Sequence, residues 1–426
     1  MDSPNPSLFP KNSGHRNKPA DERADFPLAD ADRCVKCALC LPHCPTYRLT
    51  RNENESPRGR IALMQGLAQE ALPLDERAAS HLEQCLGCRN CEPVCPAEVP
   101  YGRLIDAGRR MVRAAGHRSR RERWATAVMT RPWATRLTGG LLRLYQWSGM
   151  QWLARHSLLR LSPGLARLDG LLPDRIGRHR RRAAVRGEGK AVQLFLGCLA
   201  EEIDPGVSDA AIRLLERSGH QVVIPPNQAC CSAPAQHGGD DQTARRLSDR
   251  NVAAFDGDTP VLATASGCTA SLMEYDEIVS EASHRRFAGQ VVDICDWLQR
   301  LDWGSAQLSL NPIEERALLH LPCSQRNVVG ATGSIADLLA RIPGLELLTL
   351  DSRGQCCGAA GTYLLGQAAF SEQLGQALAD KVVAERPRYL LTSNIGCKLQ
   401  LRRQLRRRLP ECEVLHPIEL LARQLQ

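Results

Sequence analysis

Eight cysteines fall into two runs that share one spacing, C-x2-C-x2-C-x3-C-P. The first run ends at Pro45 and the second ends at Pro96. This spacing is typical of ferredoxins with two 4Fe-4S clusters, because a tight loop can present three thiolates to one cubane while the fourth comes from elsewhere. A zinc site would instead use two pairs of ligands. The two runs therefore predict two 4Fe-4S clusters as cofactors.

The last cysteine of each run is expected to serve the other cluster, as in two-cluster ferredoxins. One predicted ligand set is Cys34, Cys37, Cys40 and Cys95, and the other is Cys85, Cys88, Cys91 and Cys44. Between the runs, Ser56 and Pro57 are typical of a helix start. Arg58 and Arg60 follow them, and their side chains either face an anionic cluster or, as is commoner, are solvated.

Eight further cysteines form an internal repeat. The first four recur in the same order at offsets of 125 to 129 residues, and the two sets are Cys198, Cys230, Cys231, Cys268 and Cys323, Cys356, Cys357, Cys397. Apolar segments of strand length alternate with helical segments here, which is typical of parallel α/β sheets. Thiols at the carboxyl ends of such strands occupy the usual ligand site of the sheet. They are candidates for a further cluster or for redox thiols, and the alternative is packing or disulfide-linked cysteines.

The chain of 426 residues is long enough for about three domains. We expect a multidomain fold: a disordered leader over residues 1–24, an α-helical two-cluster ferredoxin domain over 25–110, a basic helical linker over 111–190, and two duplicated α/β domains with parallel sheets over 191–305 and 312–426. Within the first repeat, a helix is expected over residues 207–218, with Asp204 as its N-cap.

Composition and hydropathy bear on the cellular location. The N-terminus lacks the apolar segment of a secretory signal, and no apolar run reaches the roughly 18 residues of a membrane-spanning helix. Eighteen cysteines in a reducing compartment usually indicate metal or redox chemistry. We therefore expect a cytoplasmic protein.

The positive charge is concentrated in one segment. Residues 101–190 contain 21 Lys and Arg against five Asp and Glu, a net charge of +16, so the rest of the chain carries −8. Four of the six tryptophans lie in the same segment. Arginine interleaved with tryptophan fits an interfacial membrane helix, a nucleic-acid face or a docking surface for a partner, and the plain alternative is a solvated helical linker.

The chain resembles the iron-sulfur subunit of bacterial glycolate oxidase over about residues 25–426. The resemblance is carried by the two cysteine runs and by ESPRGRIALM (55–64), CCS (230–232), CCGAAGTY (356–363), SNIGCKLQL (393–401) and HPIELLA (416–422). It implies an electron-transfer subunit without catalytic residues of its own. Flavin-containing partner subunits would oxidise a 2-hydroxy acid such as glycolate, and this chain would pass the electrons to a quinone or another acceptor.

The resemblance also implies that the flavin lies on another chain, since no G-x-G-x-x-G or P-loop signature is present. We expect no nucleic-acid partner. With a membrane quinone as acceptor, the basic segment becomes a candidate for peripheral contact with the cytoplasmic face of the inner membrane or with the flavin subunit. The resemblance leaves two alternatives: an iron-sulfur subunit for lactate or glycerol-3-phosphate oxidation, or a thiol-disulfide catalytic subunit similar to that of heterodisulfide reductase.

The repeats depart from the full pattern of the related heterodisulfide reductases. Ser271 and Gln400 stand where a fifth cysteine is expected, and Ser232 replaces a glycine. Each repeat thus offers four thiols, which leaves open an ordinary cluster, a labile one or a degenerate structural site, and which argues against thiol-disulfide catalysis. A further alternative, from another class, is a basic zinc protein that binds nucleic acid.

Four remaining residues are expected to be structural. Cys295 and Cys412 have no partners in the spacing pattern and are interpreted as small buried hydrophobic residues. His320 and His416 lie near candidate sites, but core and cap roles are commoner for such histidines.

Overall fold

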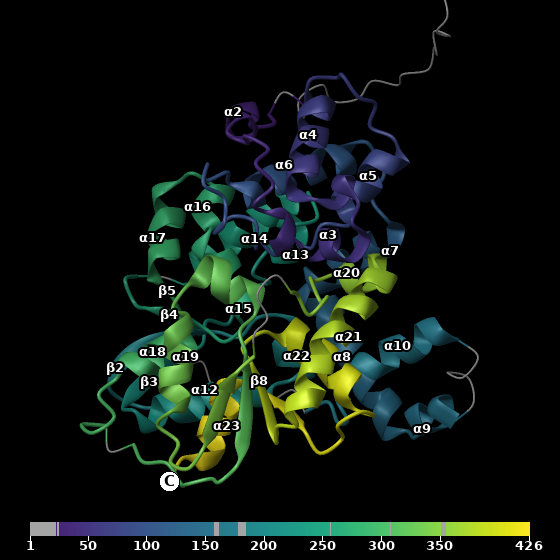
Figure 1. Cartoon of the computed structure of the whole chain (residues 1–426). Coiled ribbons are helices and arrows are strands. Elements are labelled where there is room, and N and C mark those ends of the chain that lie inside the picture. The colour runs from purple at the N-terminus through teal and green to yellow at the C-terminus, as the bar shows by residue number, and fades with distance from the viewer. Residues whose placement is uncertain are drawn as a thin grey trace, which may run out of the picture.

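The computed structural model describes residues 23, 25–156, 162–177, 185–255, 257–306, 308–350 and 355–426. The leader predicted over residues 1–24 lies outside these ranges, apart from residue 23. In Figure 1 an all-helical module lies at the top and the α/β part lies below it.

The upper module holds both cysteine runs. Its elements are α2 (Leu28–Asp32), η1 (Leu41–His43), α3 (Pro45–Thr50), η2 (Glu53–Glu55), α4 (Pro57–Ala68), α5 (Glu76–Glu83) and α6 (Tyr101–Ala114). Helix α4 begins as predicted, with Pro57 in its first turn and the Ser56 hydroxyl accepting a hydrogen bond from the Gly59 N–H at 3.0 Å. Residues Ile61, Met64 and Leu82 bury their side chains in one core with the cysteine loops. This core fixes the loops relative to each other.

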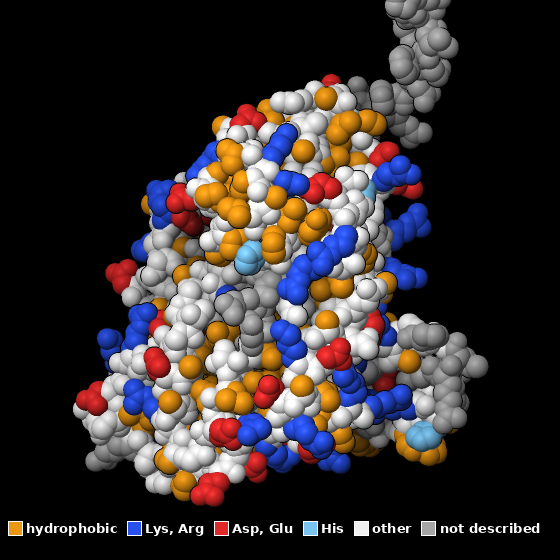
Figure 2. All heavy atoms as spheres, viewed as in Figure 1, with side chains coloured by type: hydrophobic (Ala, Val, Ile, Leu, Met, Phe, Trp, Pro, Cys, Tyr) orange, Lys and Arg blue, Asp and Glu red, His pale blue; other side chains and the backbone are white. Residues whose placement is uncertain are grey.

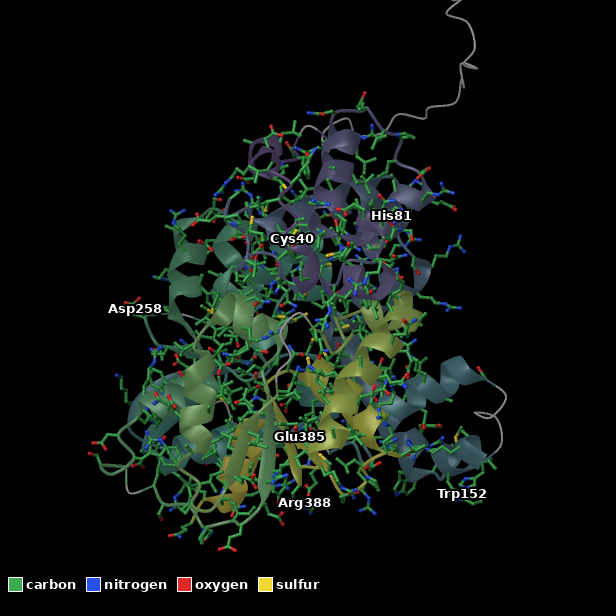
Figure 3. All side chains as sticks on the ribbon, viewed as in Figure 1. Cys40, His81, Trp152, Asp258, Glu385 and Arg388 are labelled. Atoms are coloured by element: carbon green, nitrogen blue, oxygen red, sulfur yellow. The ribbon has the colours of Figure 1, made fainter. Side chains whose placement is uncertain are left out.

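Four helices of the basic segment connect the upper module to the sheets. They are α7 (Arg120–Met129), α8 (Pro132–Trp147), α9 (Met150–His156) and α10 (Pro163–Leu171). Helix α7 packs against α20 (Tyr363–Gly366) of the second repeat, and α8 packs against α11 (Leu199–Ile203) of the first. Helix α10 packs against α22 (Ile395–Leu405) of the second repeat. Figure 3 shows Trp152 of α9 at the outer edge of the molecule, far from Cys40 in the upper module. None of the helices in the described ranges is long and apolar enough to span a membrane.

The first repeat is built on a five-stranded sheet with the order β1-β3-β2-β4-β5. The strands are β1 (Val185–Arg186), β2 (Lys190–Phe195), β3 (His220–Val223), β4 (Val261–Ala263) and β5 (Val291–Asp293). Neighbouring strands are parallel except that the short edge strand β1 is antiparallel to β3. The helices are α11 (Leu199–Ile203), α12 (Gly206–Arg217), α13 (Ala233–Gln236), α14 (Asp241–Ala254), α15 (Ser266–Met273), α16 (Tyr275–Ile278), α17 (Ala282–Gln290) and α18 (Ile294–Arg300).

The start of α12 differs from the prediction. Pro205, and not Asp204, is its N-cap. The Asp204 carboxylate instead forms an ion pair with Lys398 of the second repeat, whose side chain is buried and also pairs with Glu419. A buried ammonium group requires such partners, and this long-range demand outweighs the local capping preference.

The second repeat has a fully parallel sheet with the order β7-β6-β8-β9. Its strands are β6 (Arg316–His320), β7 (Glu346–Thr349), β8 (Tyr389–Thr392) and β9 (Glu413–Leu415). Its helical elements are η4 (Gln325–Val329, a π-helix), α19 (Thr332–Leu339), α20 (Tyr363–Gly366), α21 (Ala368–Glu385), α22 (Ile395–Leu405) and α23 (Pro417–Gln424).

One hydrophobic core joins the two repeats. Leu194 and Leu214 of the first repeat belong to the same buried cluster as Leu319, Leu391 and Leu420 of the second. Helix α12 packs against α23, and α18 packs against α19. The two sheets therefore form one packed unit.

Candidate iron-sulfur and thiol sites

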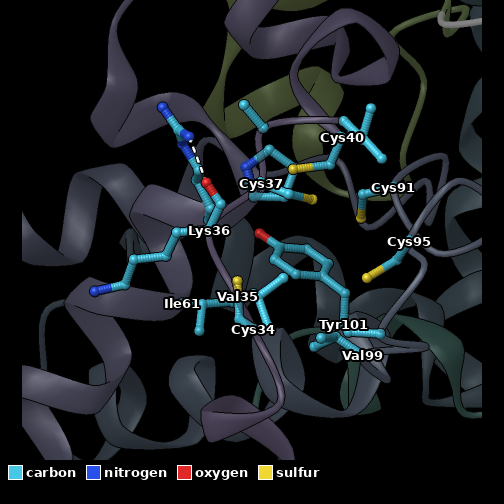
Figure 4. A pocket seen from close by; sticks show the side chains of 15 residues that line it. Cys34, Val35, Lys36, Cys37, Cys40, Ile61, Cys91, Cys95, Val99 and Tyr101 are labelled. Carbon is cyan, nitrogen blue, oxygen red and sulfur yellow. Dashed lines mark hydrogen bonds between the residues drawn. The ribbon is translucent and has the colours of Figure 1, made fainter.

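The first cavity in the upper module is lined by one of the two predicted ligand sets. Cys34, Cys37, Cys40 and Cys95 surround it together with Cys91 and the ring of Tyr101. Figure 4 shows these thiols facing a common space, with Cys37 and Cys40 from the first run opposite Cys91 and Cys95 from the second. The last cysteine of the second run is thus brought to the first run.

A second cavity is lined by the other predicted set. Cys44, Cys85, Cys88 and Cys91 surround it, so the last cysteine of the first run lies with the second run. Cys91 lines both cavities. Among the described residues, no three Cys, His, Asp or Glu side chains converge as the ligands of a single ion would. A cubane places its four thiolates on four different irons, so its ligands are farther apart than those of one ion.

The two cysteine loops share one backbone pattern. The second residue after the first cysteine of each run is left-handed, Lys36 with φ 58° and Gly87 with φ 62°. The fourth residue is also left-handed, Ala38 with φ 73° and Arg89 with φ 56°. Non-glycine residues in this region carry strain that the surrounding structure must support. The matched strain indicates that both loops are shaped for the same kind of ligand.

Burial and nearby cations set the electrostatics of these cavities. Burial raises the pKa of Cys40 to about 11, and a cation such as a cluster iron would favour the thiolate there. Of the two alternatives for Arg60, the favoured one, a solvated side chain, was wrong, because the side chain is only 1% exposed and lines the second cavity. It donates to the Thr46 hydroxyl at 3.0 Å and pairs with Glu55, which compensates its burial.

Arg58 and Arg109 support the loops from outside the thiol sets. Arg58 lines the first cavity and donates to the Lys36 carbonyl at 2.7 Å, the contact dashed in Figure 4. It also pairs with Glu53 at 2.7 Å. Arg109 is buried and donates to the Cys85 carbonyl. Sequence reasoning did not single out Arg109, which is one of many arginines in a basic segment.

Each repeat arranges its four thiols in the same order. In the first repeat Cys198, Cys230, Cys231 and Cys268 form a hydrogen-bonded series, with the first two sulfur atoms 3.7 Å apart. In the second, Cys323, Cys356, Cys357 and Cys397 form the matching series, with the last two sulfur atoms 2.7 Å apart. All eight are free thiols. They follow the carboxyl ends of β2, β3 and β4 and of β6, β7 and β8, as predicted.

A third cavity, of about 320 Å³, brings these sites together. Its lining includes all eight thiols of the repeats and also Cys85 and Cys88 of the second run. Buried Arg109 and Arg118 line it too, as do Glu122 and Met129 from the inner face of α7. The lining carries both arginines and carboxylates, and its many thiols suit a metal-sulfur group.

The positions that depart from the full pattern are occupied by bonded polar side chains. Ser232 is left-handed with φ 74°, matching Gly358 with φ 77° in the second repeat. The Ser271 hydroxyl donates to the Cys231 carbonyl at 2.6 Å and lies 3.3 Å from the Ser232 hydroxyl. Gln400 donates its amide to the Ser371 carbonyl at 2.9 Å. The two repeats therefore offer four thiols each.

The remaining candidates have structural roles. Cys295 and Cys412 are buried in hydrophobic clusters, as predicted. His320 lies in the core, where its Nδ1 is 3.0 Å from the Thr392 hydroxyl and burial lowers its pKa to about 3. His416 caps α23 by accepting from the Ile418 N–H at 3.2 Å.

Three family models match the chain. A 4Fe-4S dicluster domain covers residues 30–99, a cysteine-rich domain covers 192–273 and 317–402, and a linker region of glycolate oxidase iron-sulfur subunits covers 120–172.

Three similar proteins cover most of the chain. A probable glycolate oxidase iron-sulfur subunit of Bacillus subtilis (strain 168) is 34% identical over 394 residues, 87% of this chain and 88% of that protein. The glycolate oxidase iron-sulfur subunit of Escherichia coli (strain K12) is 30% identical over 383 residues, 86% of this chain and 89% of that protein. A fumarate reductase (CoM/CoB) subunit of Methanothermobacter marburgensis is 26% identical over 399 residues, 91% of this chain and 71% of that protein.

Proposed function

The chain belongs to the family of glycolate oxidase iron-sulfur subunits, and on this premise we propose that it carries electrons, one at a time, from a flavin-containing partner that oxidises glycolate to glyoxylate. A quinone or another acceptor receives them. The observation that supports this role best is the pair of thiol-lined cavities, because the last cysteine of each run lines the cavity of the other run. Iron-sulfur clusters supply one-electron redox chemistry at such sites.

The 4Fe-4S dicluster domain implies two clusters, and the thiols present fit them. We propose Cys34, Cys37, Cys40 and Cys95 as ligands of one cluster, and Cys85, Cys88, Cys91 and Cys44 as ligands of the other. Arg60 and Arg109 provide buried positive charge beside the second set. Such cations stabilise an anionic cluster and favour the uptake of an electron.

Electrons are proposed to enter at the first set. Cys37 is exposed, and the neighbouring side chains of Val35 and Leu39 are 69% and 55% exposed. Figure 2 shows hydrophobic side chains gathered over the upper module on the face in view. An exposed apolar surface of this kind fits a protein partner. The second set is more buried and borders the large cavity.

The repeats are proposed to hold a third redox centre, an additional iron-sulfur cluster. Adjacent cysteines are difficult to fit to a single cubane, but they suit irons that share ligands. Each repeat has one such pair, Cys230-Cys231 and Cys356-Cys357. Hydrogen bonds from Cys230 and Cys268 lower the pKa of Cys231, which favours a thiolate there. Arg109 and Arg118, both buried at the cavity, place positive charge beside these thiols.

The outer face of the basic helices is proposed to contact a membrane surface near the acceptor. Large apolar side chains follow one stripe of α7 and α8 and are 53% to 84% exposed: Trp124, Trp133, Leu137, Leu141, Leu144 and Trp147. Exposed arginines flank the stripe, and over residues 120–156 the one acidic residue, Glu122, is buried. This combination favours the interface of an anionic bilayer. We expect Leu141→Glu to abolish binding of the complex to anionic vesicles. The same variant should still reduce a soluble dye.

The decisive experiment uses the intact complex with Cys37→Ser. We expect glycolate still to reduce the flavin, while electron delivery to the acceptor is lost. Cys412→Ala serves as the control, since this cysteine lies outside all three thiol cavities. Loss of flavin reduction in the assembled Cys37→Ser complex would contradict the proposed division of labour.

Metal analysis after anaerobic purification provides an independent test. About eight irons per chain would support the two cubanes, and more would implicate the repeats. Zinc in place of iron would refute the electron-transfer role.

A further inference from the structure

The two repeats contact the second cysteine run in different ways. In the second repeat, the chain forms the π-helix η4 two residues after Cys323. From it the Asn327 amide donates to the Cys88 carbonyl at 2.6 Å and to the Asn90 side-chain oxygen at 2.7 Å. Short π-helical segments are rare and are found mostly at functional sites. The corresponding segment after Cys198 is the α-helix α11, which packs on α8 instead.

A second contact holds the other end of the same loop. The Tyr363 hydroxyl of the second repeat donates to the Gln84 carbonyl at 3.1 Å, directly before Cys85. Tyr363 is buried. The second repeat therefore holds this loop at Gln84, directly before the run, and at Cys88 within it.

Hydrophobic packing shows the same asymmetry. Cys88 and Leu86 pack in one cluster with all four thiols of the second repeat. The four thiols of the first repeat lie in a separate cluster that contains no described residue of the upper module. The first repeat reaches the upper module through polar side chains, such as the Glu274 pair with Arg89 and the 2.7 Å pair of Asp240 with Arg113.

From these contacts we infer that Asn327 is a positioning residue that holds the thiols of the second repeat against Cys88, so that the second repeat is the immediate electron acceptor of the second ferredoxin cluster. The inference rests on the proposed function. Cys85, Cys88, Cys91 and Cys44 would hold the cluster that gives up one electron, and the thiols of the second repeat would hold the centre that accepts it. The thiols of the first repeat are then reached through the second repeat.

The test compares two variants of the intact complex. Asn327→Leu keeps the size of the side chain but removes its donor to the Cys88 carbonyl. Glu274→Gln is the matched control, because it weakens the contact of the first repeat with Arg89 of the same loop. Rapid-freeze electron paramagnetic resonance after reduction by glycolate reports when each centre is reduced, and the magnetic interaction between centres reports their proximity.

We expect Asn327→Leu to slow reduction of the repeat centre by about tenfold or more, as is common when an outer-shell partner is lost, and to weaken its magnetic interaction with the second cluster. Iron content and reduction of the ferredoxin clusters should be unchanged, which separates the effect from misfolding. Glu274→Gln should change neither rate nor interaction. An unchanged rate and interaction in Asn327→Leu, or a larger effect of Glu274→Gln, would overturn the inference.

The proposed function can fail separately. If Cys323→Ser and Cys198→Ser both leave the iron content unchanged, the repeats hold no centre, and the third redox centre and this inference fall together. Suppose instead that Cys323→Ser lowers the iron content and that Cys198→Ser blocks reduction of the centre in the second repeat. In that case only the order inferred here is wrong.

Discussion

The chain contains two duplications, and they are built in opposite ways. In the upper module, each cysteine run sends its last cysteine to the cavity of the other run. In the repeats, each four-thiol series is formed within one repeat. Because each cavity of the upper module needs cysteines from both runs, a change in one run affects both cavities. Each repeat supplies all four of its own thiols, so its sequence can change without the other. The serine at position 232 and the glycine at position 358 show that they have changed.

The largest predicted effect tests the exchange. Cys44→Ser lies in the first run, yet it should remove the second cluster and about four irons per chain, while Cys95→Ser should remove the first. Iron analysis and the paramagnetic signals of the reduced protein distinguish the two clusters. Loss of the first cluster in Cys44→Ser would show that each run serves its own site.

A smaller loss of iron is expected from variants of the repeats, because each four-thiol series is formed within one repeat. Cys356→Ser should abolish the centre of the second repeat and leave the ferredoxin clusters intact. Cys230→Ser should affect the first repeat alone. The same measurements apply, and unchanged iron content together with unchanged activity in both variants would favour a packing role for these cysteines.

The glycine of the second repeat predicts a large effect on stability. Gly358 has a positive φ, and a Cβ there would lie 2.5 Å from the Ser371 carbonyl oxygen. Gly358→Ser should therefore lower the free energy of unfolding by about 2 to 4 kcal/mol, from backbone strain and overlap. Thermal unfolding of the anaerobic protein measures it. A loss under about 0.5 kcal/mol would mean that this turn tolerates a side chain as the first repeat does.

The reverse change in the first repeat should stabilise slightly. Ser232→Gly removes a left-handed serine and should raise the free energy of unfolding by up to about 1 kcal/mol. The gain is reduced by loss of the 3.3 Å contact with the Ser271 hydroxyl. Marked destabilisation in the same assay would instead show that the serine pair is needed for the turn.

The smallest effect is expected at Glu122. This residue lines the large cavity, to which the second cysteine run and both repeats contribute. Burial, together with Glu83, raises the pKa of Glu122 to about 7. The neutral form is favoured in the fold, so its contribution to stability is present at low pH and is lost as the pH rises through about 7. Glu122→Gln should be more stable than the parent protein by on the order of 1 kcal/mol at about pH 8, and less so at about pH 6. An equal difference in the free energy of unfolding at both pH values would exclude this titration of Glu122.

Spacing along the chain predicted the local parts of the sites. These parts depend on near neighbours in sequence. They are the cysteine runs, the start of α4 at Ser56 and the strand that precedes each repeated cysteine. The burial of Arg60 could not be predicted in this way, because it depends on Glu55 and on the cavity formed with Cys85. The displaced cap of α12 has a similar cause, since Asp204 pairs with Lys398 from the other repeat.

The meeting of all the repeat thiols with Cys85 and Cys88 was also beyond sequence reasoning. It requires three segments that are far apart in the sequence to pack around one cavity, and residues such as Asn327 and Tyr363 carry no local signal of that role. Their partners lie more than 200 residues away.

The single core that joins the two sheets has a consequence for turnover. Sliding one sheet past the other would expose buried side chains such as Leu214 and Leu420, each worth roughly 1.5 to 3 kcal/mol in the core. Packing therefore fixes the spacing between the two sets of repeat thiols, and the proposed relay would cross the repeats without moving parts. The pace of the proposed complex would then be set at its ends, by the arrival of reduced flavin and the departure of the reduced acceptor.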